Sequence, residues 1–395
     1  MPEFDFNSIP RNRTDDEIDA LAARVREAYP PERIRRIRSR SEWTWNSKRS
    51  AVAYRDRISY AMPAAYSAQP RESDDDPSAS DLQRETVRDL RMMLAAAAVD
   101  SEYYPGFPSG LEQITIPSMF GCVKELASDS DRIKPLINSP SDVYSLPPAE
   151  IREGTVAHEM LRRMAYKHQR CCGAGEQIRV YMTDIQGPFS CAAQMWGIQD
   201  FLCDLREYPD EAHHLLSLCT DAITAYFRAM YEVTEGTLIP IHCHPVIWVP
   251  EDCGVAVSDD FFAVVGAETV KEFSIPYLEK IGAAFGGVTA HTCGNMNHLA
   301  GVMNETKTLK ALNFGNSETD LEKYAAECDP RITLIVHQSG LSAGGLPVLN
   351  DEQRLKLCAR VQRKTGVKIF CTFPAGPSAT PTPADKKAWP EAAAL

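Results

Sequence analysis

Short apolar runs alternate with amphipathic segments from about residue 81 onward. The runs are rich in Val, Ile and Thr, which favours strands, and the segments between them repeat apolar residues at helical spacing. The predicted strands are residues 96–100, 114–119, 178–184, 238–244, 288–291, 309–314, 333–337 and 367–372. This alternation predicts a parallel sheet covered by helices. Eight strands in roughly 300 residues fit a closed (β/α)8 TIM barrel, and an open doubly wound sheet is the alternative.

The longest amphipathic segments lie between these strands, at residues 209–235, 267–285 and 320–328. The residues from Asn350 to Gln353 predict a capped helix before the last strand. No G-x-G-x-x-G or P-loop follows any predicted strand. The usual reason for an open nucleotide-binding sheet is therefore missing, and the barrel is favoured.

Residues 1–80 follow a different pattern. A capping box at Thr14 and Glu17 predicts a helix, which two prolines at 30 and 31 end. Five arginines between residues 33 and 40 form a basic segment. This segment is either a solvated face that pairs with the acidic body, or a clamp for an anionic substrate or a dimer contact.

A polar, turn-like stretch at residues 73–80 marks the expected boundary with the main domain. We therefore divide the chain into an N-terminal helical or irregular extension, residues 1–80, and a (β/α)8 barrel, residues 81–395.

Composition narrows the class of protein. The chain has 395 residues, of which 44% are hydrophobic, and a net charge of −12. An acidic protein lacks the cationic field that nucleic acids and anionic membranes attract, so neither is an expected partner. The acidic N-terminus has no apolar leader-like run, and no stretch has the roughly 18 apolar residues of a membrane span. We expect a cytoplasmic enzyme whose twelve cysteines are reduced.

Reactive side chains collect at the ends of the predicted strands. In a barrel the carboxyl ends of all strands meet on one face, where the active site lies. Asp184 ends the third predicted strand, His242 and His244 end the fourth, and Gln338 follows the seventh. We take Asp184, His244 and Gln338 as the candidate catalytic residues.

A possible metal site is carried by His291, Cys293 and the distant Cys371. Residues two apart on a strand share a face, so His291 and Cys293 can bind one ion, and Cys371 ends the last predicted strand. Imidazole and thiolates suit Zn²⁺ with one position left open. From spacing alone, a core histidine and two buried thiols remain the alternative. His242 and His244 form a rival metal cluster or the wall of a polar pocket. One of them, or Glu251, Asp252 or Gln338, could be a fourth ligand or could position substrate.

A set of motifs resembles the uroporphyrinogen decarboxylase superfamily, and within it the zinc-dependent methyltransferase branch. The motifs follow the superfamily's order over most of residues 110–388. They are Asp184-Ile-Gln-Gly-Pro-Phe189, Val257-Ser-Asp-Asp260, Phe273-Ser-Ile-Pro-Tyr277, His291-Thr-Cys-Gly-Asn295 and Thr380-Pro-Thr-Pro383. The arginine-rich N-terminal signature of the true decarboxylases is not recognisable, which argues against porphyrinogen decarboxylation.

The resemblance implies a function for these residues. It makes His291, Cys293 and Cys371 the zinc ligands, and places Asp260 and Asn295 in the cofactor-binding region. The implied reaction exchanges a methyl or alkyl group between a zinc-bound thiolate and a corrinoid such as methylcobalamin. A small-molecule thiol or methylated substrate and a corrinoid protein are the candidate partners, and a homodimer is compatible with the sequence. The alternative is a metal-free decarboxylase or lyase in which Asp184 is the key acid.

Overall fold

Parallel strands form the centre of the fold. The computed structural model describes residues 4–46, 78–97, 103–110, 113–124, 133–173, 175–241, 247–337 and 345–372. A five-stranded parallel sheet has the order β3-β4-β5-β6-β7, and a two-stranded parallel sheet pairs β1 with β2. The strands are β1 (Gly106–Phe107), β2 (Arg179–Val180), β3 (Val255–Ser258), β4 (Val288–His291), β5 (Leu309–Gly315), β6 (Thr333–His337) and β7 (Lys368–Cys371).

Two isolated parallel bridges extend the pairing beyond these strands. Tyr181 pairs with Ile239, and Gln186 pairs with Ser258 at the end of β3. The segment after β2 therefore lies beside both residue 239 and the edge of the larger sheet. The predicted α/β class is confirmed, whereas the strands within the described residues form two sheets rather than one closed ring.

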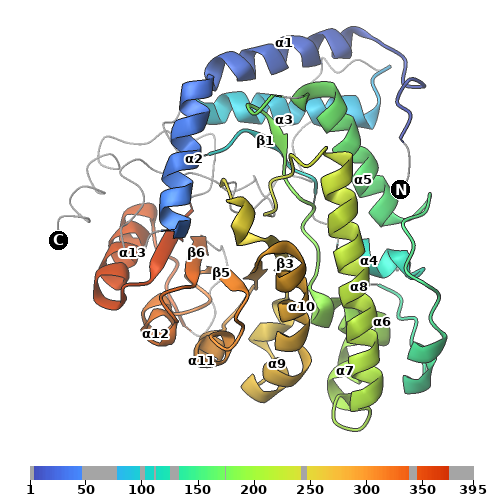
Figure 1. Cartoon of the computed structure of the whole chain (residues 1–395), viewed down its shortest axis with the longest axis vertical. Helices are drawn as coiled ribbons and strands as arrows, with labels where there is room; N and C mark the ends of the chain where they lie inside the picture. Colours follow the sequence, from blue (N-terminus) through green and yellow to red (C-terminus); the bar gives the residue numbers. More distant parts are fainter. Residues whose placement is uncertain are drawn as a thin grey trace.

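Helices surround the strands (Figure 1). In Figure 1 α1 and α3 lie side by side across one end, and α9 to α13 lie beside the larger sheet. None of the helices in the described ranges combines the length and apolar composition that a membrane crossing needs. The helices are α1 (Arg13–Ala28), α2 (Pro31–Asn46), α3 (Asp81–Ala97), α4 (Thr115–Met119), α5 (Val156–Lys167), α6 (Pro188–Trp196), α7 (Ile198–Asp204), α8 (Pro209–Val233), α9 (Ala267–Phe273), α10 (Ile275–Phe285), α11 (Ala300–Met303), α12 (Leu321–Glu327) and α13 (Asp351–Thr365).

The later predicted strands are confirmed and the first two are wrong. Strands β4 to β7 lie within one or two residues of the predicted ranges. Residues 96 and 97 instead end helix α3, and residues 115–119 form helix α4. Strands β1 and β3 were not predicted. A short buried run is equally apolar in a helix and in a strand, so periodicity alone cannot separate them.

Most of the predicted helices are confirmed. Helix α8 corresponds to the predicted segment 209–235, and Asn350 and Gln353 form the expected capping box of α13. The segment 267–285 is broken at Ser274, because Pro276 in the first turn of α10 has no N–H for a continuous helix. The N-terminal capping box is formed by Asn12 and Asp15 rather than by Thr14 and Glu17.

The N-terminal helices pack onto the rest of the chain. The Trp45 indole at the end of α2 donates to the carbonyl of Trp248 (3.0 Å), and Lys368 donates to the carbonyl of Trp45 (2.9 Å). Arg38 from the basic segment pairs with Glu176 (3.0 Å) and lies 4.3 Å from the ring centre of Trp248. Of the two interpretations of the basic segment, pairing with the acidic body is the one that Arg38 follows. The division at residue 80 stays a prediction.

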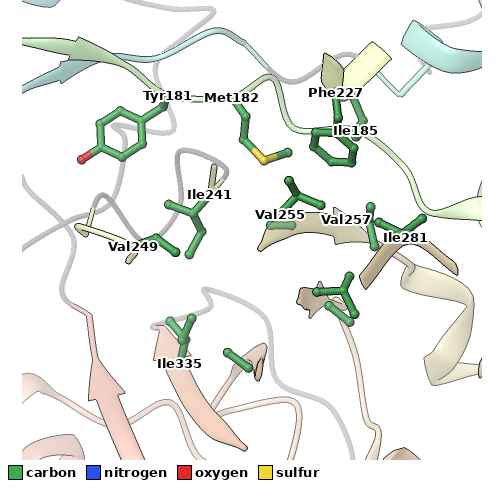
Figure 2. Packing of buried hydrophobic residues seen from close by; sticks show 14 of the residues in the cluster. Tyr181, Met182, Ile185, Phe227, Ile241, Val249, Val255, Val257, Ile281 and Ile335 are labelled. Carbon is green, nitrogen blue, oxygen red and sulfur yellow. The ribbon is translucent and has the colours of Figure 1, made fainter. Parts of the chain in front are cut away.

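Apolar side chains from separate segments fill the interior between the strands. Figure 2 shows Met182, Ile241, Val255 and Ile335 gathered around one apolar region. All four are buried, with at most 1% of their surface exposed. Their packing holds the strand ends, and with them the polar residues described below, in fixed positions.

A buried ion cluster joins α3 to α5. The Lys167 ammonium group lies 2.8 Å from carboxylate oxygens of both Glu85 and Asp89, and donates to the carbonyl of Pro108 (2.9 Å). The Lys167 and Asp89 side chains are fully buried. Burial raises the pKa of Asp89 although the nearby lysine charge opposes it. Lys167 is the fully buried cation that both carboxylates share, and the partly exposed Arg163 and Arg88 pair with Glu85 and Asp89 from the rim of the cluster.

We expect Lys167→Met to lower the free energy of unfolding by about 3–5 kcal/mol, because it removes the buried cation that lies 2.8 Å from both Glu85 and the fully buried Asp89. Lys356→Met is the matched control. Lys356 forms an exposed pair with Glu352 within α13, and its loss should change stability by about 0.5 kcal/mol or less. Urea denaturation of both variants measures the difference. Equal stability of the two variants would contradict the assigned role of Lys167.

Candidate metal centre

Hydrogen bonds join the polar segment that follows β2 to the polar residues at the end of β3. The Ser258 hydroxyl donates to Asp184 Oδ1 (2.6 Å), and the Gly187 N–H donates to the Ser258 carbonyl (2.7 Å). The N–H and hydroxyl of Ser190 both donate to Asp259 Oδ1 (3.1 and 2.6 Å). A Cβ at Gly187 would lie only 2.6 Å from Asp259 Oδ2, so this approach requires glycine. These contacts fix the Asp184 segment against the segment that carries Asp260.

Asp260, His291 and Cys293 bring three possible metal-binding atoms within 4.8 Å of one another. His291 ends β4 and pairs in register with Ser258, which places it beside the turn that contains Asp260. The His291 Nε2 atom lies 3.4 Å from Cys293 Sγ, and the Cys293 N–H donates to Asp260 Oδ1 (2.8 Å). His291 is buried, Asp260 is half-buried and Cys293 is exposed, so the group reaches the surface.

Asn313 orients the His291 ring. Asn313 Nδ2 donates to the carbonyl of Ile335 (2.8 Å), which can only accept, so the opposite amide atom is the oxygen. That oxygen lies 2.7 Å from His291 Nδ1. Nδ1 must therefore carry the proton, and Nε2 keeps the lone pair that a metal ion needs. The second Nδ2 hydrogen reaches Nδ1 of His337 at the end of β6 (3.2 Å).

Carboxylates surround Cys293. Burial of the sulfur and the negative charges of Asp260, Glu318 and Asp184 together raise the pKa of the Cys293 thiol to about 12. An uncompensated thiolate is therefore disfavoured at this position. A bound cation would reverse that balance, because it attracts the carboxylates and the thiolate together.

Two buried carboxyl groups beside the centre ionise near neutral pH. Burial raises the pKa of Asp184 to about 6, against the favourable effects of His291 and the Ser258 hydrogen bond. Burial raises the pKa of Asp259 to about 7, although Ser190 donates to it. Asp184 can therefore exchange a proton in the physiological range, as a general acid or base must.

Cys371 does not lie with His291 and Cys293. Phe370 is in register with the interior residue Ile335, so alternation along β7 turns Cys371 toward the covering helices. There its thiol interacts with Cys358 of α13, and this hydrogen bond is the largest cause that raises the pKa of Cys358. The predicted His–Cys–Cys trio assumed that Cys371 faces the interior. In the structure Asp260, and not Cys371, is the third residue of the group whose possible donor atoms lie within 4.8 Å of one another.

The other predicted site residues have different outcomes. His244 and Gln338 lie outside the described residues, as does His242. Asn295 is half-buried, and its Oδ1 accepts from the Asn297 N–H (3.0 Å) in a local turn. This contact shapes the loop after Cys293, and the role of Asn295 in cofactor binding stays a prediction.

Sequence reasoning missed Asn313, Asp259 and Glu318. Asn313 and Glu318 are buried polar residues in or just after an apolar strand, at 0% and 3% exposure. An amide within the run Leu309–Gly315 was an available signal, because a polar group in a buried strand needs a partner. The identity of that partner depends on strand register, which the sequence does not show.

Residues 115–237 match the uroporphyrinogen decarboxylase (URO-D) family. The resemblance that the motifs predict is confirmed. The match contains Asp184 and ends before Asp260, so the candidate metal-binding residues are argued from their own geometry. Among solved structures, a methyltransferase from Methanosarcina mazei is similar at 15% identity and a TM-score of 0.48, over 71% of this chain and 77% of that chain. A comparison with curated proteins gives no match.

The raised pKa of Asp259 predicts a pH-dependent stability. The pKa of Asp259 is about 7 in the folded protein, whereas the ordinary pKa of an aspartate is 3.8. The folded state therefore keeps this proton to a higher pH than the unfolded chain does. This group therefore stabilises the fold at low pH, and its contribution is lost as pH rises from about 4 to 7, by up to about 4 kcal/mol. Asp259→Asn keeps an acceptor for Ser190 without the charge. We expect the variant to gain stability relative to the wild type between pH 5 and pH 8, measured by urea denaturation of chelator-treated protein. A constant difference across that range would contradict the assignment.

Proposed function

We propose that this chain is a zinc-dependent enzyme that transfers a methyl or other alkyl group to or from a thiol. The observation that carries the proposal is the convergence of Asp260, His291 and Cys293 at the carboxyl ends of neighbouring parallel strands. This is the end of an α/β sheet at which ligands and substrates bind. The match to the uroporphyrinogen decarboxylase family supports the same placement, because it contains Asp184 at the same end.

The donor set suits zinc. Zinc binds thiolate sulfur at about 2.3 Å and imidazole nitrogen at about 2.0–2.1 Å, which separates the two donors by roughly 3.6 Å at a tetrahedral angle. The observed separation of Cys293 Sγ and His291 Nε2 is 3.4 Å. Asp260 supplies the third donor, and its hydrogen bond from Cys293 holds the two residues together. Three protein ligands leave the fourth zinc position for a substrate, as catalytic zinc sites do.

Zinc, when bound, would keep a coordinated substrate thiol deprotonated and therefore nucleophilic. The two anionic ligands, Asp260 and Cys293, neutralise the ion's charge, so the bound sulfur remains electron-rich. Asp184 is the candidate acceptor for the thiol proton, because burial raises its pKa to about 6. Ser258 holds the Asp184 carboxyl in position through Oδ1. The proposed methyl donor or acceptor is a corrinoid such as methylcobalamin, either free or on a corrinoid protein.

We further propose that the strands belong to a (β/α)8 barrel. The parallel bridges Tyr181–Ile239 and Gln186–Ser258 support it, because they place the segment after β2 between residue 239 and β3. A barrel would gather Asp184, Asp260 and His291 at one open mouth. The extension of residues 1–80 and the barrel of residues 81–395 are part of this proposal.

A metal-free decarboxylase or lyase is the second candidate. The observation in its favour is Asp184, a buried carboxyl group with a raised pKa inside the matched segment. The carboxylates around Cys293 argue for the first candidate, because they favour a cation and disfavour a bare thiolate.

Metal content tests the ligand set. We expect about one zinc per chain in the wild type, and at least tenfold weaker binding in Asp260→Asn and Cys293→Ala, because each loses one of three protein ligands. Asp260→Asn keeps an acceptor for the Cys293 N–H. Cys371→Ala is the matched control and should keep its zinc. Elemental analysis and chelator competition measure both. Loss of zinc from Cys371→Ala with retention in Asp260→Asn would overturn this ligand set.

Asp184→Asn should retain zinc and lose activity. Loss of a proton acceptor is expected to lower kcat about 10²–10⁴-fold. The assay follows the absorbance change of methylcobalamin with a panel of thiols. In the wild type, kcat/KM should fall as pH drops through about 6, because Asp184 becomes protonated, and the variant should lack this dependence. The exposed Asp200→Asn variant is the control. Full turnover by Asp184→Asn would exclude the proton-transfer role.

A further inference from the structure

A cavity of about 180 Å³ lies at the opposite end of the same strands. Its lining includes Lys310 near the start of β5 and Lys368 at the start of β7. Lys307 and Arg331 add two further cations, and among the described residues of the lining Asp252 is the one carboxylate. The cavity is thus strongly basic in a chain whose net charge is −12.

The lysines of the cavity lack acidic partners. Within the described parts of the chain, no carboxylate forms an ion pair with the ammonium groups of Lys307, Lys310 or Lys368. Asp252 interacts with the neighbouring Cys253 thiol (3.8 Å). Lys307 is exposed to solvent, whereas Lys310 and Lys368 are half-buried. Two half-buried ammonium groups without an acidic partner indicate a ligand of opposite charge.

The charge of Lys310 acts on Lys368. Burial lowers the pKa of Lys368 and the charge of Lys310 lowers it further, with Cys253 acting in the opposite direction. The two ammonium groups therefore face the same small space. Lys368 uses one hydrogen on the carbonyl of Trp45 (2.9 Å), which leaves two for a ligand.

The backbone holds the other cations in place. A Cβ at Gly287 would lie 2.5 Å from Lys310 Cγ, so the absence of a side chain there makes room for the Lys310 stem. Arg331 donates to the carbonyls of Asn304, Thr306 and Lys307 (2.6–2.9 Å). Arg331 also pairs with Asp329 (3.1 Å), so its position beside the cavity is fixed and its charge is partly offset.

We propose that this cavity binds a small oxyanion with two or more negative charges, namely a phosphate group that is either free or part of a phosphorylated metabolite. A volume of about 180 Å³ is below the roughly 300 Å³ of sites that enclose drug-sized ligands, and corresponds to about six water molecules. The site lies away from Asp260, His291 and Cys293 and does not depend on the proposed methyl transfer.

Thermal unfolding with inorganic phosphate, pyrophosphate and glycerol 3-phosphate, at ionic strength matched with chloride, tests the proposal. We expect a saturable rise in Tm for the wild type and about tenfold or more weaker binding for Lys310→Gln, because one charged hydrogen bond is lost. The exposed Lys323→Gln on α12 is the matched control and should bind as the wild type does. Tighter binding of the ester or of the free ion identifies the physiological form.

Two further measurements keep the result independent of folding and of the metal centre. Without added anion at low salt, Lys310→Gln should be at least as stable as the wild type, because a repulsive charge is removed. Cys293→Ala should bind phosphate normally. The proposal is overturned if the wild type shows no saturable shift up to about 10 mM anion. It is also overturned if Lys310→Gln binds as tightly as the wild type, or if Cys293→Ala loses binding.

Discussion

The register of the parallel strands is the constraint on which the candidate site depends. Ser258, His291, Asn313 and Ile335 occupy matched positions on β3, β4, β5 and β6. This row allows Asn313 to donate to the carbonyl of Ile335 and accept from His291. A shift of one residue would turn these side chains to the opposite face and leave buried polar groups without partners. Sheet pairing therefore sets which nitrogen of the candidate metal ligand His291 carries the proton.

The two ends of the larger sheet carry opposite charge. Asp184, Asp260 and Glu318 lie close enough to Cys293 at the carboxyl end to raise the pKa of its thiol. Lys310 and Lys368 lie at the amino end, where the charge of Lys310 helps to lower the pKa of Lys368. Each end thus has an electrostatic arrangement that a bound ion of opposite sign would stabilise, a cation at one end and an anion at the other.

Much of the fold could be predicted from the sequence, and the reasons are local. Strands β4 to β7 are apolar runs bounded by polar residues, and helix α8 has a long amphipathic repeat, so each was recognisable alone. Helix α4 was mistaken for a strand because five buried residues do not display either period. Strand β3 was missed although its motif, Ser258-Asp-Asp260, was noted, because the four residues before the carboxylates are short and uniformly buried.

The sequence by itself determined the α/β class, the resemblance to the uroporphyrinogen decarboxylase family, and the pairing of His291 with Cys293, because residues two apart share a face. Only the tertiary structure decided the third member of the group. The sequence cannot show whether Cys371 or Phe370 faces the interior, since that depends on pairing with β6. Cys371 contacts Cys358, and Asp260 reaches Cys293 because β3 lies beside β4. Residues that are far apart in the sequence come together because of the register between strands, and that register exists only in the assembled sheet.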